Sequence, residues 1–328
     1  MKPSMESPSK TKSFLLVGTV ILTVLTLCSF FVGKYPLTLS GLLSGDAIQW
    51  RVFLTLRASR AVIGAIGGFV LGVTGFVYQT VFRNPLASPD IIGASSGASV
   101  GAAFGILFLP GAVAVTLSAF AGAICCVLLA LTLSSLTAEK DGKSIVLSGI
   151  AVHSLAQTAL VCLKLLADPE KQLASIEYWI MGSLNGISLY SIGGNIALCL
   201  LCLLGMFLLY RQILLLSLDD QEGRLLGVNV TQIRLIVLLI ATLAASSVIS
   251  MTGLISFISL LAPHGARLLF KNNHLSTMLF SGLLGGCLLT LGDIFARSIA
   301  STELPVSIFT SLLAPFLIYL CIRRKPLQ

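Results

Sequence analysis

The sequence predicts an all-α, polytopic membrane protein with about ten transmembrane helices and both termini in the cytoplasm. Of its 328 residues, 56% are hydrophobic and only 10% are charged, and the mean hydropathy is +0.98. The apolar residues form repeated runs of roughly 20, enough for a helix to cross about 30 Å of hydrocarbon. Because backbone groups in lipid must be hydrogen-bonded within their own segment, these runs are expected to be helices. A water-soluble fold is excluded.

The first predicted helix covers 14–32, an apolar run after a basic start. We interpret it as a spanning helix and not as a cleaved signal peptide, because no small-residue cleavage site follows it. A lipoprotein signal is also disfavoured, since the bulky Leu27 precedes Cys28.

The next two predicted helices, 58–82 and 91–109, carry glycine at four-residue intervals. The glycines are Gly64, Gly68 and Gly72 in one, and Gly93, Gly97, Gly101 and Gly105 in the other. Small residues on one face allow membrane helices to pack closely. A sliding surface for conformational change is the alternative interpretation.

The remaining spans rest on hydropathy. They are 111–136, 145–166, 192–210, 232–250, 253–270, 277–298 and 306–322. Pro263, His264 and Arg267 fall inside or beside the span 253–270 and are expected to mark its end. The longest segments between spans are 33–57, 167–191 and 211–231. They are too short for an extramembrane domain, so 1–328 is predicted to be one transmembrane domain.

The distribution of Lys and Arg predicts the orientation. With both termini inside, two thirds of the 21 basic residues fall on the cytoplasmic side, as the positive-inside rule requires. The net charge of +8 is therefore a topology signal, and nucleic-acid binding is not expected. The predicted location is the cytoplasmic membrane of a bacterial-type cell, with membrane lipid as the surroundings. The eight cysteines lie almost wholly in apolar spans and are interpreted as small hydrophobic residues.

The sequence lacks the residues that several kinds of functional site require. A phosphate-binding loop would need a glycine where Thr137 precedes Gly142, Lys143 and Ser144. The three histidines share no ligand spacing, so no metal site and no cofactor bound by this chain are predicted. The sequence shows no arrangement of nucleophilic residues that would indicate an enzyme. A gradient-driven secondary transporter stays open as an alternative, although the spans contain few ionisable groups to carry protons or ions.

Motifs along most of the chain point to one family. They are Arg83, Asn84, Pro85, Leu86 and Ala87; Trp179, Gly182 and Ser183; FISLLAPHGAR with Pro263, His264 and Arg267; and Glu303, Leu304 and Pro305. In this order they strongly resemble the iron-siderophore, haem and cobalamin permease family of ABC importers. The sequence departs from the family pattern at Ile258, Ser259, Ser307 and Ala314, which stand where the family more often has a Val-Gly pair or glycine.

The resemblance implies a permease subunit that translocates a metal chelate. A ferric siderophore is the expected cargo, with haem or cobalamin as alternatives. The implied partners are a second permease, identical or paralogous, two cytoplasmic ATPase subunits that use ATP, and an extracytoplasmic substrate-binding (lipo)protein. The motif residues Arg83 to Ala87, Pro263, His264, Arg267, Glu303 and Pro305 are interpreted as structural.

Docking of the binding protein is expected at Arg57, Arg60 and Arg297, which match family positions on the predicted outer face. Guanidinium groups suit this role because they can bind a carboxylate with two hydrogen bonds. The alternative is that these arginines are ordinary interfacial anchors at helix ends.

The resemblance implies contact with the ATPase in the inner segment 218–229, which matches the family's short coupling helices. Asp219 and Asp220 could cap a short helix and Gly227 could end it, leaving Leu225 and Leu226 as an apolar knob. The segment also contains Glu222, Gly223 and Arg224. The alternative is a solvated connecting loop.

The resemblance also implies a cytoplasmic gate beside the turn 137–144, with Thr137 and Gly142, and at the helix that follows. His153, Ser154 and Gln157 of that helix would face the pathway. A packed, hydrogen-bonded histidine is the alternative interpretation of His153.

Overall fold

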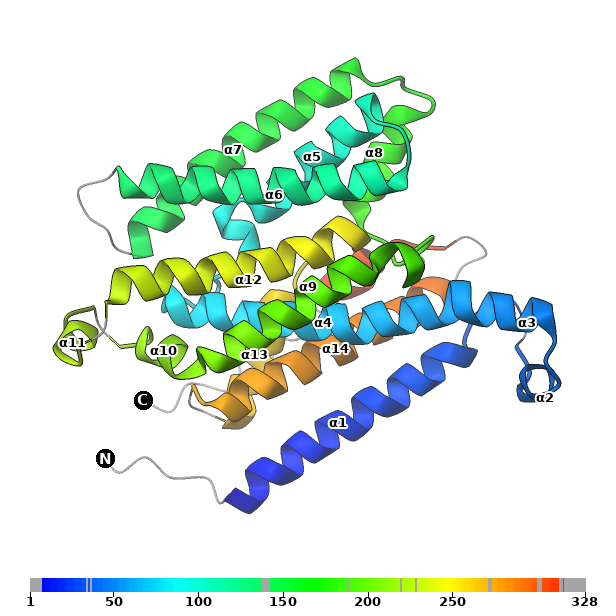
Figure 1. Ribbon diagram of the computed structural model, residues 1–328, viewed down its shortest axis with the longest axis horizontal. Coiled ribbons are helices and arrows are strands. Elements are labelled where there is room, and N and C mark those ends of the chain that lie inside the picture. The colour runs from blue at the N-terminus through cyan, green and yellow to red at the C-terminus, as the bar shows by residue number, and fades with distance from the viewer. Residues whose placement is uncertain are drawn as a thin grey trace.

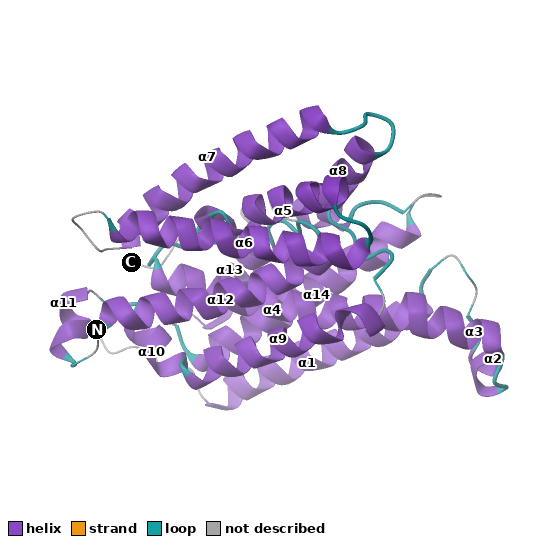
Figure 2. Cartoon of the chain, turned by 45° about the horizontal axis from the view of Figure 1, so that its top comes forward, coloured by secondary structure: helices purple, strands orange, loops and turns teal. Residues whose placement is uncertain are grey.

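A computed structural model describes residues 8–33, 35, 37–136, 142–187, 189–218, 220–227, 229–270, 273–299, 303–312 and 315. Over these residues the chain is helical and contains no strand (Figures 1 and 2). The α-helices are α1 (Pro8–Phe31), α2 (Leu39–Leu43), α3 (Ala47–Val52), α4 (Ser59–Val81), α5 (Ala94–Phe108), α6 (Ala112–Ser135), α7 (Gly142–Leu166), α8 (Gln172–Met181), α9 (Leu189–Leu208), α10 (Tyr210–Leu215), α11 (Asp220–Leu225), α12 (Val230–Thr252), α13 (Ile258–Phe270) and α14 (Leu275–Ser298). A π-helical segment, η1 (Phe53–Ala58), and a 3-10 turn, η2 (Pro89–Ile92), complete the elements.

Each of the ten predicted spans falls on a helix. Among the described residues, six helices are long and apolar enough to cross a membrane: Lys10–Phe31, Ala47–Val81, Ala112–Ser135, Ser144–Leu166, Val230–Thr252 and Leu275–Ser298. Three shorter apolar helices, Ala94–Phe108, Gly193–Leu208 and Ile258–Phe270, fall on three more. The tenth span is helical over 306–312, and beyond that only Pro315 is described.

The segment 33–57 is more ordered than the sequence predicted. Thr38 and Asp46 cap α2 and α3 by accepting hydrogen bonds from backbone N–H groups of the first turn. The chain then continues through η1 into α4 without a break, giving one helical stretch from Ala47 to Val81. Arg57 therefore lies in a helix and not in a loop.

The glycine faces pack helix against helix, as the first interpretation predicted. Gly68 and Gly72 of α4 lie directly against the backbone of α14 at Gly285 and Ser281. Gly97 and Gly101 of α5 lie in the same way against α6. A Cβ at any of these four positions would collide with a backbone carbonyl, which is the close approach that small residues permit.

Gly93 is a correction to the glycine pattern. Its φ of +87° places it in the left-handed region at the N-cap of α5. Glycine is suited to that backbone conformation because it has no Cβ, so Gly93 starts the helix and does not belong to its packing face.

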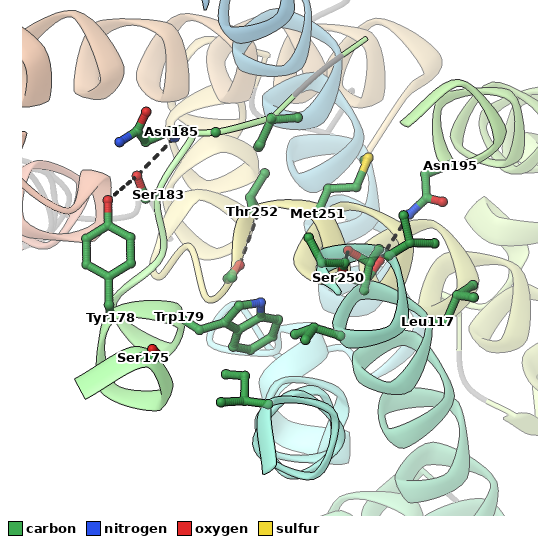
Figure 3. A pocket seen from close by; sticks show the side chains of 18 of the residues that line it. Leu117, Ser175, Tyr178, Trp179, Ser183, Asn185, Asn195, Ser250, Met251 and Thr252 are labelled. Atoms are coloured by element: carbon green, nitrogen blue, oxygen red, sulfur yellow. Dashed lines mark hydrogen bonds between the residues drawn. The ribbon is translucent and has the colours of Figure 1, made fainter. Parts of the chain in front are cut away.

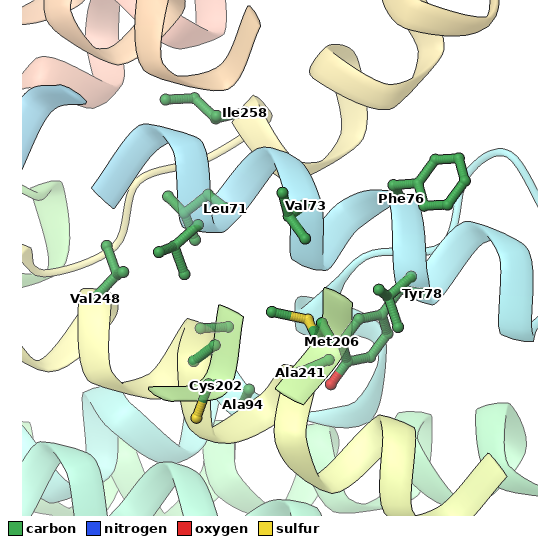
Figure 4. Close-up of a cluster of buried hydrophobic side chains, with 14 of the residues drawn as sticks. Leu71, Val73, Phe76, Tyr78, Ala94, Cys202, Met206, Ala241, Val248 and Ile258 are labelled. Atoms are coloured by element: carbon green, nitrogen blue, oxygen red, sulfur yellow. The ribbon is translucent and has the colours of Figure 1, made fainter. Parts of the chain in front are cut away.

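The buried core surrounds α4, as Figure 4 shows. Phe76 and Tyr78 of α4 are fully buried, together with Ala241 and Val248 of α12. The Tyr78 hydroxyl is 2.6 Å from the Thr242 hydroxyl of α12, so its polar tip is hydrogen-bonded within the core. By contrast, α1, α6 and α7 expose many large apolar side chains, as expected for helices that face lipid.

The cysteines divide between these two settings. Cys199, Cys202 and Cys287 are buried, whereas Cys28, Cys125 and Cys162 lie on exposed faces of apolar helices. None of these six is in a disulfide.

The span predicted at 253–270 ends at the last residue of α13, but its first residues are not helical. The chain is irregular over 253–257, and α13 then runs through Pro263 to Phe270. Proline removes the hydrogen bond to the carbonyl four residues earlier, which is that of Ser259. That carbonyl lies against Gly75 of α4, and the Gln79 side chain of α4 donates to the Leu260 carbonyl at 3.1 Å. Packing against α4 therefore lets the helix continue past the proline.

Candidate functional site

Two ends of the helical bundle carry the polar features that the sequence singled out. At one end, which we call the arginine end, Arg57, Arg60 and Arg297 come together where α4 begins and α14 finishes. At the other, which we call the α11 end, the short helix α11 projects beyond the start of α12 (Figure 1).

An ion-pair network occupies the arginine end. The Arg60 guanidinium donates to the Asp293 carboxylate at 2.8 and 3.1 Å and to Glu303 at 2.9 Å. Arg297, one turn after Asp293 in α14, lies 3.1 Å from the other Asp293 oxygen and also contacts the Ser29 hydroxyl of α1. The network thus joins α1, α4, α14 and the segment that precedes the last helix.

Arg57 has a different set of partners. Its guanidinium donates to the Val32 carbonyl and, at 3.0 Å, to the Tyr35 carbonyl. These carbonyls follow the last turn of α1, where backbone acceptors lack helical partners and a cation is favourable. Arg57 therefore fixes the end of α1 against the start of α4.

These contacts correct the expectation that the three arginines stand free on a surface. Arg57, Arg60 and Arg297 are 5%, 6% and 3% exposed. Three arginines against Asp293 and Glu303 leave one positive charge in the cluster. The Nε and Nη1 atoms of Arg297 are buried with no hydrogen-bond partner among the described residues.

The α11 end contains the segment that was predicted to contact an ATPase. α11 begins at Asp220 and is followed by Gly227 at φ +77°, the left-handed conformation expected after a helix. Leu225 and Leu226 are 87% and 60% exposed, so the predicted apolar knob protrudes. Glu222 is exposed and Gly223 is buried. Asp219 lies outside the described residues, as does the side chain of Arg224.

A cavity of about 730 Å³ opens near the arginine end between α6, α8, α9 and α12 (Figure 3). Its wall combines apolar side chains with uncharged polar ones, including Trp179, Asn185, Asn195, Ser250 and Thr252. The Asn195 amide donates to the Ser250 hydroxyl at 3.1 Å. The lining contains no charged residue.

Two backbone hydrogen bonds join separate segments of the chain beside this cavity. The Ser183 N–H donates to the Thr252 carbonyl at 2.7 Å, and the Val306 N–H donates to the Gly182 carbonyl at 3.1 Å. The Ser307 hydroxyl, at a position where the family more often has glycine, donates to the Leu254 carbonyl at 2.6 Å. The ends of α8 and α12 and the start of the last helix therefore meet at Gly182.

Replacing Gly182 with alanine should destabilise the fold more than the same change at Gly186. Both glycines have φ near +70°, but only Gly182 lies against another backbone, at Leu254; Gly186 has open space around it. We expect a difference of about 2 kcal/mol, a typical cost of overpacking, measured by thermal unfolding of the purified protein. Equal losses of stability in the two variants would show that the contact between Gly182 and the Leu254 carbonyl tolerates a methyl group.

None of the predicted gate residues that the structure describes lines the cavity. The Ser154 hydroxyl donates to the Ile150 carbonyl within α7, and Gln157 is exposed. His153 is half-buried, and Gly142 is the first residue of α7. Thr137 lies outside the described residues. The structure does not bring these residues together into one site.

The motif residues make mostly structural contacts. Arg83 pairs with Asp220, and the Asn84 side chain accepts from the Leu86 N–H at 2.9 Å. Ala87 is buried, whereas Pro85 and Leu86 are exposed.

In α13, Arg267 contacts the Gln79 side chain, lies 3.4 Å from the Thr80 hydroxyl and stacks over Phe76. Pro263 is buried and His264 is half-buried. Glu303 belongs to the arginine-end network, and Pro305 precedes the last helix.

Sequence reasoning missed Arg234, whose side chain is 3% exposed and binds Asp220 at 2.7 Å. A single arginine near the start of an apolar span was the available signal, but orientation rules use it only as a surface charge. No group of three metal-ligating side chains occurs among the described residues.

Comparison with known proteins gives consistent matches over most of the chain. The FecCD transport family matches residues 21–323. The hemin transport system permease protein HmuU of Yersinia pestis is 33% identical over 97% of both chains. An iron chelatin transport system permease protein of Helicobacter pylori is 35% identical over 84% of this chain and 83% of its own. An inward-facing structure of a metal-chelate type ABC transporter superimposes with a TM-score of 0.83 at 27% identity, covering 96% of this chain and 99% of the other.

Proposed function

This chain belongs to the FecCD transport family, and we propose that it moves a ferric siderophore through the membrane with energy from a separate ATPase. It is a permease subunit of the ABC importers that carry metal chelates, and not an enzyme. It is a multi-pass protein of the cytoplasmic membrane. Haem and cobalamin are the alternative cargoes.

The observation that carries the proposed coupling to an ATPase is the shape of the α11 segment. A short helix that presents Leu225 and Leu226 to solvent has an unpartnered apolar surface in this chain. Such a surface is the kind of anchor that a cleft on another protein can bury. ATP would be hydrolysed in that partner, and this chain would hold no cofactor of its own.

Binding-protein docking is proposed at the arginine end. Because Arg57, Arg60 and Arg297 are buried, they would act on an acidic partner mainly through the excess positive charge of the cluster. Such complementarity favours the rate and orientation of association more than its strength. The same arginines stabilise the bundle, so the two roles overlap.

The cargo path is proposed to run beside a second permease copy, identical or paralogous, with Thr137, Gly142, His153, Ser154 and Gln157 near its inner gate. The low number of charged residues within the spans supports an ATP-driven importer over a gradient-driven transporter, because gradient-driven transporters use ionisable groups within the membrane.

Reconstituted transport would test the proposal. Liposomes containing the chain, its ATPase and its binding protein should take up radio-iron-labelled ferrioxamine only when ATP is supplied on the ATPase side. Haemin and cyanocobalamin serve as parallel cargoes. Uptake that continues without the ATPase and follows a proton or sodium gradient would contradict the proposal in favour of the secondary transporter.

A further inference from the structure

Asp220, the first residue of α11, lies between two arginines from different parts of the chain. Its Oδ1 atom accepts from Arg234 Nη2 at 2.7 Å and from Arg83 Nη2 at 3.2 Å. Arg234 is in the second turn of α12, and Arg83 is in the turn directly after α4. One carboxylate therefore connects α11 to two of the long helices.

The contact to Arg234 is nearly enclosed. The Arg234 side chain is 3% exposed and Asp220 is 24% exposed. Arg234 Nε is buried without a hydrogen-bond partner among the described residues. A buried guanidinium that lost its carboxylate would be strongly unfavourable, so Arg234 holds Asp220 in place.

Arg83 reaches Asp220 from an unusual backbone conformation. Its φ is +50°, in the left-handed region that residues with a Cβ seldom adopt. The same guanidinium also donates to the Leu218 carbonyl at 3.2 Å, just before α11. Arg83, in the turn after α4, thus contacts the segment at both Leu218 and Asp220.

Packing reinforces these ion pairs on one side of α11 only. Gly223 is so close to Val230 at the start of α12 that a Cβ would lie 2.7 Å from a Val230 methyl group. Leu225 and Leu226 are exposed. The segment therefore has a fixed inner side against α12 and a free apolar tip.

α12 extends from this attachment to the cavity near the arginine end. It runs from Val230 to Thr252, and Ser250, Met251 and Thr252 line that cavity. Figure 1 shows α12 spanning the bundle, with α11 at one of its ends. A displacement of α11 that moved α12 would therefore reach residues that line the cavity.

We propose that Asp220 is a positioning residue, which fixes the ATPase-contacting segment to α4 through Arg83 and to α12 through Arg234. Movement imposed on Leu225 and Leu226 then shifts these two helices instead of bending α11 alone. The inference rests on the proposed function of this chain as a permease driven by an ATPase.

Two measurements on the variants Asp220→Asn, Arg234→Gln and their double combination would test this proposal. They are hydrogen exchange of the purified chain and ATP-driven transport in liposomes. Arg211→Gln is the matched control, because Arg211 is an exposed arginine of the neighbouring α10. In the purified chain, backbone amides of 220–227 should exchange about tenfold faster in the variants than in the control, since α11 opens locally when its ion pairs are lost. In liposomes with the ATPase and binding protein, ATP hydrolysis should persist while ferrioxamine carried per ATP falls about tenfold.

The double variant should be no worse than the more affected single one, because both changes break the same contact. Unchanged hydrogen-exchange rates in all variants would overturn the proposed attachment of α11 through Asp220. Faster exchange with an unchanged ratio of transport to hydrolysis would overturn the positioning role. If the unmodified chain moves no chelate with ATP, the proposed function itself fails and the coupling role fails with it, whatever the exchange result.

Discussion

Replacing Arg60 with alanine should lower the free energy of unfolding by about 3–5 kcal/mol, the usual effect of removing one partner of a buried ion pair. Arg60 supplies two hydrogen bonds to Asp293, whose side chain is 1% exposed, and one to Glu303. Without Arg60, Asp293 would retain Arg297, but most of its hydrogen bonding would be lost in a buried site. Thermal unfolding of the purified protein, followed by size-exclusion chromatography, measures the loss.

Arg51→Ala is the control for this experiment. Arg51 is an exposed arginine at the end of α3, two turns before Arg60, and its loss should change stability little. If Arg60→Ala were as stable as the control and lost only its association with the binding protein, docking would be the main role of Arg60. The ion-pair network would then contribute little to the fold.

Changing Leu225 and Leu226 to aspartate should abolish ATP-driven uptake while leaving the fold intact. Both side chains are exposed, so their replacement removes few contacts within the chain. Two charges would, however, enter the apolar surface proposed to lie in the ATPase cleft, where unpaired charges are costly. Copurification of the ATPase and uptake of ferrioxamine by reconstituted liposomes measure the effect.

Leu136→Asp is the matched control, because Leu136 is a leucine of similar exposure, 84%, directly after α6. It should retain the ATPase. Retention of the ATPase and of full uptake by the Leu225 and Leu226 variant would remove α11 from the interface. Equal loss in the control would indicate a general effect of added charge at this end.

Much of the fold could be predicted because lipid imposes strong constraints on a sequence. Ten apolar runs predicted ten helical segments, and glycine spacing predicted close packing on one face of α4 and of α5, although the partner helices α14 and α6 were found only in the structure. The errors occurred where the effect of a residue on the local backbone depends on contacts with another helix. The span predicted from 253 starts as a helix only at Ile258, and α13 continues through Pro263 to Phe270. Gly75 and Gln79 of α4 lie against the carbonyls around that proline.

The candidate site was predicted less completely. The short helix at 220–225 and its exposed leucines followed from local pattern, since capping residues and a final glycine are read within a few positions. The partners of Asp220 did not, because Arg83 and Arg234 lie on either side of it, 137 and 14 positions away. Likewise, Asp293 could be paired with Arg297 by its four-residue spacing, whereas its contact with Arg60 joins residues 233 positions apart.

Composition and motifs of adjacent residues were enough to predict that this chain crosses the membrane many times, that its charges lie at the helix ends, and to which permease family it belongs. The role of the charges at each end became visible only when distant helices were brought together. Arginines that the sequence placed on an outer surface are buried against Asp293, Glu303 and the end of α1, because a guanidinium removed from water must find acceptors and those acceptors come from distant helices.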